Sequence, residues 1–177
     1  MAEISSRVNP LFLREEELHQ GMELLLFAYR DFMAEADGLL AERGLGRAHH
    51  RAAYFIGRHP DISVSELLGL LGITKQSLSR VLNSLVDAKY VEVRPGPNDR
   101  RQRLLSLTES GRELERALTH NQRHHFARAY REAGAEAVDG FRKVLAGLVG
   151  DDRRMRLPRA GTETGANTGA KTREGGG

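Results

Sequence analysis

The fold is decided by residues 63–107, whose sequence is SVSELLGLLGITKQSLSRVLNSLVDAKYVEVRPGPNDRRQRLLSL. Ser63 and Glu66 have the spacing of a capping box, in which each side chain satisfies a free backbone N–H at the start of a helix. The short leucine-rich helix that follows ends at a glycine, and Thr74 then caps a second helix expected over Lys75–Ala88. Two helices joined by so short a glycine-containing turn form a helix-turn-helix.

Two segments after these helices alternate apolar and polar residues, as strands with one buried face do. They are Tyr90–Arg94 and Arg103–Leu107, and the turn-forming sequence PGPND follows the first of them. This pattern predicts a β-hairpin, and a hairpin directly after a helix-turn-helix is the wing of a winged helix. The expected fold class is therefore mainly α with a small β-hairpin wing.

The segment before the helix-turn-helix predicts two helices. Asn9 and Pro10 form a helix start, and apolar residues then step by threes and fours to Ala36 in the narrow seam of a helix that packs on others. Asp37–Gly38 is expected to break this helix. A second helix is expected over Arg47–Arg58, ending before a proline.

The segment after the wing predicts a long helical region followed by a tail. Thr108 caps a helix that Gly134 interrupts and that ends near Val149. From Asp151 the chain is rich in glycine and has no aromatic residue, so we expect disorder there. The expected division is an N-terminal dimerisation helix and linker over 1–44, a winged helix-turn-helix over 45–107, C-terminal dimerisation helices over 108–150 and a disordered tail over 151–177.

Composition narrows the class of protein. Of the 177 residues, 40% are hydrophobic and 29% are charged, so a packed core is feasible. The net charge of +3 and the isoelectric point near 9.5 favour a polyanionic partner. The absence of cysteine excludes disulfides, thiol redox sensing and cysteine-ligated metals. With no long apolar run and no apolar leader segment, we expect a cytoplasmic protein without a membrane partner.

The second helix of the helix-turn-helix has a polar face suited to reading DNA. On a helical wheel, Arg80, Asn83 and Asp87 fall within about 40° of Gln76, and Ser79 lies about 60° to the other side. Arginine pairs bidentately with guanine edges, whereas asparagine and glutamine suit adenine. By itself this face is typical of a solvated surface, but its place in a helix-turn-helix favours base contacts.

The predicted wing is densely basic. Arg94, Arg100, Arg101 and Arg103 lie within ten residues, with Asp99 as the only acid among them. Like charges this close repel one another unless a polyanion neutralises them. An arginine at the wing tip can enter the minor groove, where the potential is most negative.

The sequence over Asn98–Gly111, with an Asp-x-Arg at the wing tip and a strand that ends in Leu-Thr-x-x-Gly, resembles the signature of the MarR family. Ser65–Leu67, Ile73–Ser77 and Leu85–Val91 fit the helix-turn-helix of that family, and the order of elements agrees over Leu11–Val149. The stretch GRAHH at residues 46–50 resembles its PetP-like branch in particular.

The resemblance implies a homodimeric regulator of transcription that binds palindromic operator DNA, more often as a repressor than as an activator. It implies that the first and last helices intertwine in the dimer and that a small-molecule effector binds between the dimerisation and DNA-binding lobes. It also implies that Asp99 orients Arg101 by a salt bridge. The expected DNA-binding residues are Lys75, Gln76, Ser77, Ser79, Arg80, Asn83, Arg94, Asp99, Arg100, Arg101 and Arg103, and the expected effector-pocket residues are Tyr29, His49 and His50.

Two other functions remain open at this point. His120 and His124 stand at i, i+4 with His125 beside them, and this spacing suits a metal-sensing winged helix. The favoured expectation is nevertheless a protein without a metal site or a cofactor. A winged helix can also serve as a protein-interaction module. Steep weakening of binding with salt would separate DNA from an apolar protein partner. No arrangement of nucleophile, base and acid supports an enzyme.

Overall fold

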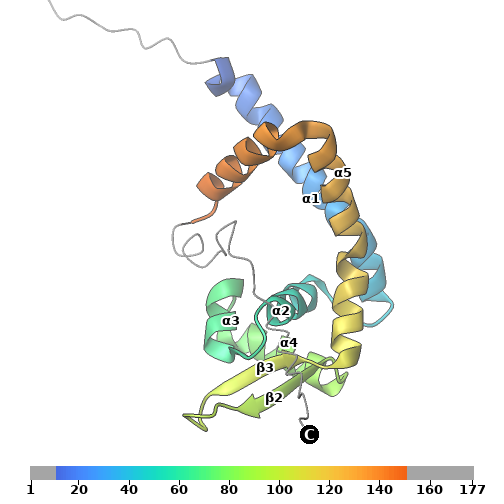
Figure 1. The fold of residues 1–177 in the computed structure, drawn as a ribbon, viewed down its shortest axis with the longest axis vertical. Helices are drawn as coiled ribbons and strands as arrows, with labels where there is room; N and C mark the ends of the chain where they lie inside the picture. Colours follow the sequence, from blue (N-terminus) through green and yellow to red (C-terminus); the bar gives the residue numbers. More distant parts are fainter. Residues whose placement is uncertain (1–10, 151–177) are drawn as a thin grey trace, which may run out of the picture.

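The computed structural model describes residues 11–150. In Figure 1, helices α2, α3 and α4 and a small sheet form one end of the molecule, and α1 and α5 extend from it side by side. The elements are a short 3-10 helix at Leu11–Leu13, α1 (Glu15–Ala41), α2 (Arg47–Arg58), β1 (Ile62–Ser63), α3 (Val64–Leu71), α4 (Lys75–Asp87), β2 (Val91–Pro95), β3 (Arg103–Leu107) and α5 (Glu109–Leu148). The mainly α fold with a β-hairpin wing is confirmed.

The helix-turn-helix forms through the caps expected from its sequence. Ser63 Oγ accepts the backbone N–H of Glu66 at 3.2 Å, and the Glu66 carboxylate accepts the backbone N–H of Ser63 at 2.9 Å. Gly72 ends α3 in the left-handed conformation at φ 61°, which glycine adopts without a steric penalty. Thr74 Oγ1 accepts the N–H of Ser77 at 3.1 Å and so caps α4.

The sheet has a third strand that the sequence analysis did not predict. β1 pairs antiparallel with β3 on the side opposite β2, with Ile62 across from Leu105, so the strand order is β1-β3-β2. The hairpin itself pairs Val91 with Leu107 and Pro95 with Arg103. β1 has only two residues, and this is too short for an alternating pattern to mark it.

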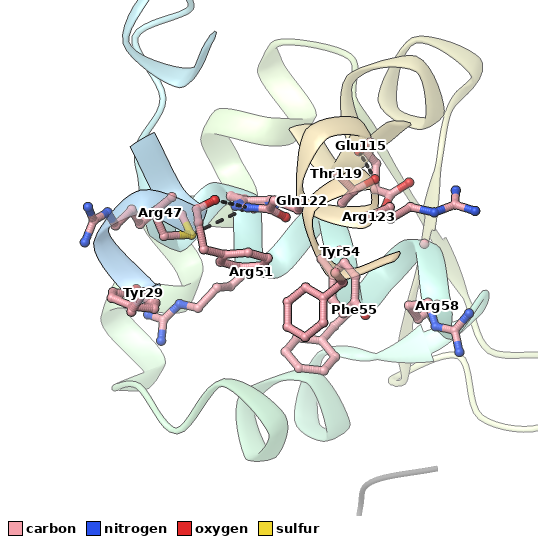
Figure 2. A pocket seen from close by; sticks show the side chains of 15 residues that line it. Tyr29, Arg47, Arg51, Tyr54, Phe55, Arg58, Glu115, Thr119, Gln122 and Arg123 are labelled. Carbon is pink, nitrogen blue, oxygen red and sulfur yellow. Dashed lines mark hydrogen bonds between the residues drawn. The ribbon is translucent and has the colours of Figure 1, made fainter. Parts of the chain in front are cut away.

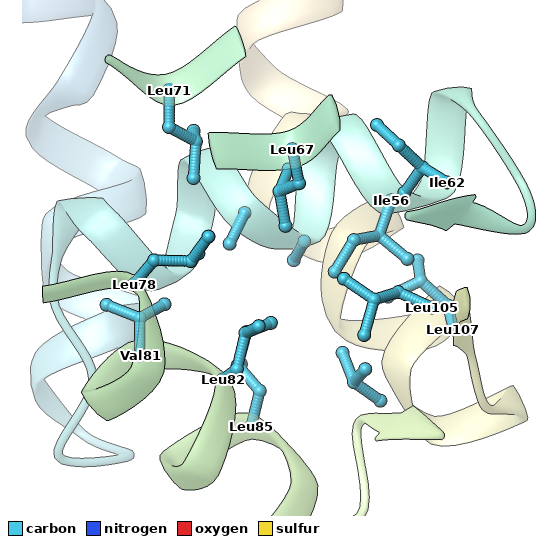
Figure 3. Packing of buried hydrophobic residues seen from close by; sticks show 13 residues of the cluster. Ile56, Ile62, Leu67, Leu71, Leu78, Val81, Leu82, Leu85, Leu105 and Leu107 are labelled. Carbon is cyan, nitrogen blue, oxygen red and sulfur yellow. The ribbon is translucent and has the colours of Figure 1, made fainter. Parts of the chain in front are cut away.

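One apolar core holds this end of the molecule together. Figure 3 shows side chains from α2, α3, α4 and the sheet meeting in it. Ile56, Leu67, Leu85 and Leu105 are each fully shielded from solvent. The core fixes α4 against α2 and the wing strands, so the exposed face of α4 has a defined direction.

A smaller apolar cluster joins α1 to α5. Met33, Ala36 and Leu40 of α1 pack against Leu114 and Leu118 of α5. No buried residue occurs in the described part of α1 before Met33, nor in α5 after Gln122. The outer halves of both helices therefore present their apolar seams to solvent in the single chain.

The first helix differs from its predicted bounds. α1 continues through Asp37 and Gly38 to Ala41, where the sequence analysis expected a break. Glycine inside a helix costs only about 1 kcal/mol relative to alanine. Burial of Leu40, which is 1% exposed, one turn after Ala36 outweighs that cost. The expected start at Asn9–Pro10 and the expected disordered tail over 151–177 lie outside the described residues.

The other predicted features of the flanking helices are confirmed. α2 spans Arg47–Arg58 as expected. Gly134 interrupts α5 with non-helical angles of φ 80° and ψ 167°, and Figure 1 shows the chain changing direction sharply along this helix. No helix within residues 11–150 combines the length and apolar character needed to cross a bilayer.

The start of α5 is anchored on the turn that follows α4. Thr108 Oγ1 accepts the N–H of Gly111 at 3.0 Å, and it donates to the carbonyl of Lys89 at 2.6 Å. The backbone N–H of Thr108 donates to the carbonyl of Tyr90 at 3.1 Å. A Cβ at position 111 would lie 1.9 Å from that carbonyl oxygen, so only glycine fits there.

We therefore expect Gly111→Ala to lower the free energy of unfolding by about 1–3 kcal/mol or more, because the added methyl group meets backbone that cannot rotate away. Gly38→Ala is the matched control: nothing lies within 4 Å of the added Cβ, and alanine favours the helix. Urea unfolding at one protein concentration measures both variants. Equal stability of Gly111→Ala and the unchanged protein would contradict the described junction.

Candidate nucleic-acid interface

The outward face of α4 carries a row of polar side chains. Lys75, Gln76, Ser79, Arg80 and Asn83 are all exposed, while the apolar side of the helix is buried in the core. Within residues 11–150, none of these five side chains takes part in a hydrogen bond or ion pair with another residue. Their donors and acceptors are therefore available to a partner.

Ser77 differs from the rest of the predicted reading face. Its hydroxyl accepts a hydrogen bond from Thr74 Oγ1 at 2.9 Å, and its backbone N–H is held by the same threonine. The first turn of α4 is thus ordered by a pair of hydroxyl groups. Ser77 remains exposed, but one of its acceptor positions is already used.

The basic side chains at the wing tip are free. Arg100, Arg101 and Arg103 are exposed, and their guanidinium groups form no ion pair with any residue in the described part of the chain. Three unneutralised cations on one short hairpin raise the local positive potential. Such a surface attracts a polyanion.

Asp99 orders the wing tip in a different way from the one implied by the family resemblance. The expected salt bridge to Arg101 does not form; instead, Asp99 Oδ1 accepts the backbone N–H of Arg101 at 2.9 Å. The backbone N–H of Gln102 donates to the Asp99 carbonyl at 3.0 Å, and that of Gly96 donates to the Gln102 carbonyl at 2.9 Å. An aspartate that bonds the backbone two residues ahead makes an Asx turn, so Asp99 sets the path of the chain at Arg101.

Arg94 is engaged on strand β2, close to the turn of the hairpin. Its guanidinium pairs with the carboxylate of Asp61, which also accepts a hydrogen bond from Ser106 Oγ at 2.8 Å. The hydrogen bond from Arg94 lowers the pKa of Asp61, and Ser106 adds to this effect. Arg94 therefore differs from the other three wing arginines, because its charge is already matched.

Asp61 was missed by the sequence analysis. It lies in the loop between α2 and β1 with a left-handed φ of 66°, a conformation that aspartate tolerates better than most residues. Its backbone N–H donates to the Leu105 carbonyl at 3.1 Å, so it touches both β2 and β3. The only sequence signal is the Pro60-Asp61 pair, which marks a turn but not its partners.

A cavity of about 830 Å³ lies between α1, α2 and α5. Figure 2 shows Tyr29 and Arg51 on one side of it, Arg58 and Arg123 on the other, and the rings of Tyr54 and Phe55 between them. Of the residues expected to line an effector pocket, Tyr29 and His50 do so. His49 does not, because its Nδ1 accepts the backbone N–H of Gly46 at 3.0 Å and caps α2.

His50 is one of the buried polar residues in the cavity wall. His50 is 5% exposed, and its Nδ1 has no hydrogen-bond partner among the described residues. Burial lowers the pKa of His50, with Asp37 opposing that effect. The imidazole is therefore neutral near pH 7 and has a nitrogen without a partner.

The rim on the α1 side is closed by an ion pair. Arg47 donates three hydrogen bonds to Asp37, from Nη2 to Oδ2 at 2.6 Å and from Nε to Oδ1 at 2.9 Å and to Oδ2 at 3.1 Å. Its guanidinium also stacks over the Tyr29 ring at 5.5 Å. The hydrogen bond from Arg47 lowers the pKa of Asp37. This contact links the end of α1 to the start of α2.

The sequence analysis named only three pocket residues and missed the contribution of α5. Phe126 and Gln122 of α5 complete the wall, and Gln122 Nε2 donates to the Phe32 carbonyl of α1 at 3.3 Å. Phe126 packs edge to face on Phe32, with ring centroids 5.5 Å apart. The spacing of Gln122 and Phe126 marks one helix face, but a single sequence does not show that this face meets α1 and α2.

The histidines considered for metal binding lie on α5. His120, His124 and His125 are exposed, and the described residues contain no cluster of three or more potential ligands able to hold a metal ion. The metal-sensing alternative has no site in this part of the chain.

Comparison with known proteins agrees with this geometry. The model of the MarR family matches residues 43–102, which contain the helix-turn-helix and most of the wing. The HTH-type transcriptional regulator PetP of Rhodobacter capsulatus is 50% identical over 139 residues, which is 78% of this chain and 84% of that protein. The chain belongs to the MarR family. It is therefore a regulator of transcription and not an enzyme, and the resemblance to PetP is confirmed.

Solved structures of MarR-family proteins share the fold. Streptococcus pneumoniae FabT, in complex with DNA, superposes with a TM-score of 0.62 at 21% identity, covering 74% of this chain and 94% of FabT. A mutant MarR from E. coli, complexed with operator DNA, superposes with a TM-score of 0.56 at 20% identity, covering 80% of this chain and all of that one. In both cases the likeness extends well beyond the winged helix.

Asp99 variants test the wing-tip turn. Asp99→Asn keeps an oxygen that accepts the Arg101 N–H and removes the charge, whereas Asp99→Ala removes both. We expect faster hydrogen exchange at the Arg101 amide and weaker DNA binding for Asp99→Ala alone. Asp99→Asn should bind DNA at least as tightly as the unchanged protein, because phosphate repulsion falls. Tighter binding by Asp99→Ala as well would show that the turn is unimportant and that only the charge counts.

Proposed function

We propose that this MarR-family protein is a homodimeric repressor that binds a palindromic operator and is released from it by a small molecule. The observation that carries the proposal is the pairing of two free surfaces on one folded unit: the unpartnered polar row on α4 and the unneutralised arginines of the adjoining wing. A row of exposed hydrogen-bonding groups on the second helix of a helix-turn-helix suits the major groove. The DNA-bound state of FabT and of MarR, which share the fold, supports this assignment.

The two surfaces would contribute different kinds of contact. Base edges would be read from α4, by Lys75, Gln76, Ser77, Ser79, Arg80 and Asn83. The wing would lie along the flanking minor groove, where Arg100, Arg101 and Arg103 meet phosphates and the narrow groove. Arg94 would hold the wing in position through Asp61 more than it neutralises phosphate, and Asp99 would shape the tip.

Dimerisation is supported by apolar seams that have no partner within the described chain. Leu18, Met22 and Leu25 on α1 are each about half exposed, at 49%, 53% and 46%. Phe141 and Leu148 beyond the α5 kink are 40% and 66% exposed. Apolar area on this scale is unusual on a monomer surface, and a second copy could cover both seams across a two-fold axis.

This arrangement gives the regions of the chain separate roles. Residues 45–107 would form the DNA-binding domain, and 1–44 with 108–150 would form the dimerisation region. The cavity lies where these regions meet, because α1 and α5 line it together with α2. An effector bound there would favour one relative position of the two DNA-binding domains, which would release the operator.

The rival functions lack a comparable observation. A protein-interaction module would need an apolar docking face on the winged helix, but the exposed side of α4 is polar and basic. A regulator that binds chromosomal operator DNA is located in the cytoplasm, and this location is part of the proposal. Repression is proposed in place of activation because it is the commoner behaviour of the family.

Alanine substitutions should separate base contacts from phosphate contacts. Arg80→Ala should cost about 1–3 kcal/mol at the cognate site and relax the preference at one base pair. Arg103→Ala should weaken binding to all sequences and lower the slope of log affinity against log salt by about one unit. Arg116→Ala, which removes the same charge from α5, is the control.

Selection of bound sequences from random DNA, followed by titration at several salt concentrations, measures both effects. If Arg80→Ala and Arg103→Ala only rescale affinity without changing preference, the assignment of α4 as the reading face is wrong. If the unchanged protein selects no sequence at all, the proposed function itself fails.

The assembly is tested in solution. Sedimentation velocity at micromolar concentration should show a dimer, and operator half-sites should lie about 10 base pairs apart, centre to centre. Leu25→Arg should break the dimer, because a charge enters the apolar seam. Glu113→Arg, on an exposed position of α5 outside the seam, should not. A stable folded monomer of the unchanged protein would contradict the proposal.

A further inference from the structure

The cavity wall contains more positive charge than the chain itself neutralises. Arg51, Arg58 and Arg123 are exposed and line the cavity, and within residues 11–150 their side chains form no hydrogen bond or ion pair. Arg47 differs from these three, because Asp37 already holds it. The single acid among the lining residues is Glu115. The cavity is therefore poised for a ligand with negative charge.

The cavity arginines of α2 lie on one side of that helix, spaced along its axis. Arg47, Arg51 and Arg58 fall within about 40° of one another on α2, because their spacings of four and seven residues are close to whole turns. At a rise of about 1.5 Å per residue, Arg51 and Arg58 lie about 10 Å apart along the helix axis. Figure 2 shows them on opposite sides of the cavity, with Arg123 of α5 on the side of Arg58.

Apolar rings occupy the space between the two charged ends. Tyr54 and Phe55 lie between Arg51 and Arg58 in Figure 2 and pack edge to face, with ring centroids 5.5 Å apart. Phe32 and Phe126 form part of the wall. Tyr54 and Phe126 remain about 40% exposed, so a ligand body would cover apolar surface there.

We propose that the cavity takes an elongated apolar ligand that carries an anionic group at each end. One anion would pair with Arg51, the other with Arg58 and Arg123, and the rings of Tyr54 and Phe55 would contact the body between them. Guanidinium groups bind carboxylates bidentately, so each end would be held by charge-assisted hydrogen bonds. The cavity of about 830 Å³ is within the range that holds ligands of drug size.

His50 adds a polar group to the wall of this site. Its buried Nδ1 has no partner among the described residues, which is a costly state that a hydrogen bond with a ligand would relieve. The inference rests on the proposed function, since it specifies the class of effector that acts at the same cavity.

Three aromatic acids of graded length and charge test the proposal by isothermal titration calorimetry without DNA. Biphenyl-4,4′-dicarboxylate has two anions on a long apolar body, biphenyl-4-carboxylate has one, and terephthalate has two on a short body. We expect the long dianion to bind about tenfold more tightly than either of the others, because only it engages both ends. Equal affinity for the long monoanion, or no binding of the long dianion at millimolar concentration, would overturn the proposal.

Variants at each end locate the anions. Arg51→Gln and Arg58→Gln should each reduce the affinity for the long dianion to near that of the monoanion, and the double variant should reduce it further. Arg116→Gln, on an exposed arginine of α5 outside the cavity, should leave the affinity unchanged. Thermal unfolding shows that each variant folds, which is expected because Arg51 and Arg58 are exposed. Unchanged affinity in both single variants would overturn the assignment.

DNA titrations separate this inference from the proposed function. Release of labelled operator by the long dianion would support both. Calorimetric binding without release would support the ligand class and contradict effector control. Loss of DNA affinity in Arg51→Gln or Arg58→Gln as large as that in Arg103→Ala would show that these arginines serve the phosphate backbone, and the ligand proposal would fall.

Discussion

The turn after α4 and the start of α5 are held together so closely that no side chain fits at position 111. Thr108 bonds the carbonyl of Lys89 through its hydroxyl and that of Tyr90 through its backbone N–H, and Ser110 Oγ adds a second bond to Lys89 at 2.9 Å. This junction fixes the direction in which the 40-residue helix α5 leaves the winged helix, relative to α4. The orientation of α5 relative to α4 depends on this junction, together with the contacts that α5 makes with α1 and α2.

The chain uses its charged residues in two distinct ways. Asp61 and Asp37 bind guanidinium groups, and Glu66 binds the hydroxyl and then the backbone N–H of Ser63. These hydrogen bonds shape the fold, and they lower the pKa of each of the three carboxyl groups. In contrast, the arginines at the wing tip and the cavity arginines other than Arg47 form no ion pair within residues 11–150. The acids of this protein therefore organise the scaffold, while its free cations mark the surfaces at which anionic partners are expected.

Local chemistry explains which parts of the structure the sequence predicts. Ser63, Thr74 and Thr108 cap helices through residues three positions away, and Gly134 interrupts one through its own backbone, so each signal is complete within a short window. β1, the Asp61 contacts and the cavity depend on partners 33 to 90 residues distant. Asp99 shows where prediction from the sequence stops. The sequence places this residue at the wing tip, but only the turn geometry shows that its carboxylate accepts the backbone N–H of Arg101 and not the guanidinium.

Helix α2 takes part in both the apolar core and the cavity. Ala52, Ala53 and Ile56 bury one side of it in the core, while its arginines border the cavity. Only two residues, His59 and Pro60, separate its end from Asp61, which holds both wing strands. Since a close-packed core resists shearing, α2 is expected to move as a rigid body and to transmit small displacements from the cavity to the wing. The length of the loop after Arg58 would then set how far the wing moves for a given displacement at the cavity. This property is separate from the affinity for DNA or for the effector.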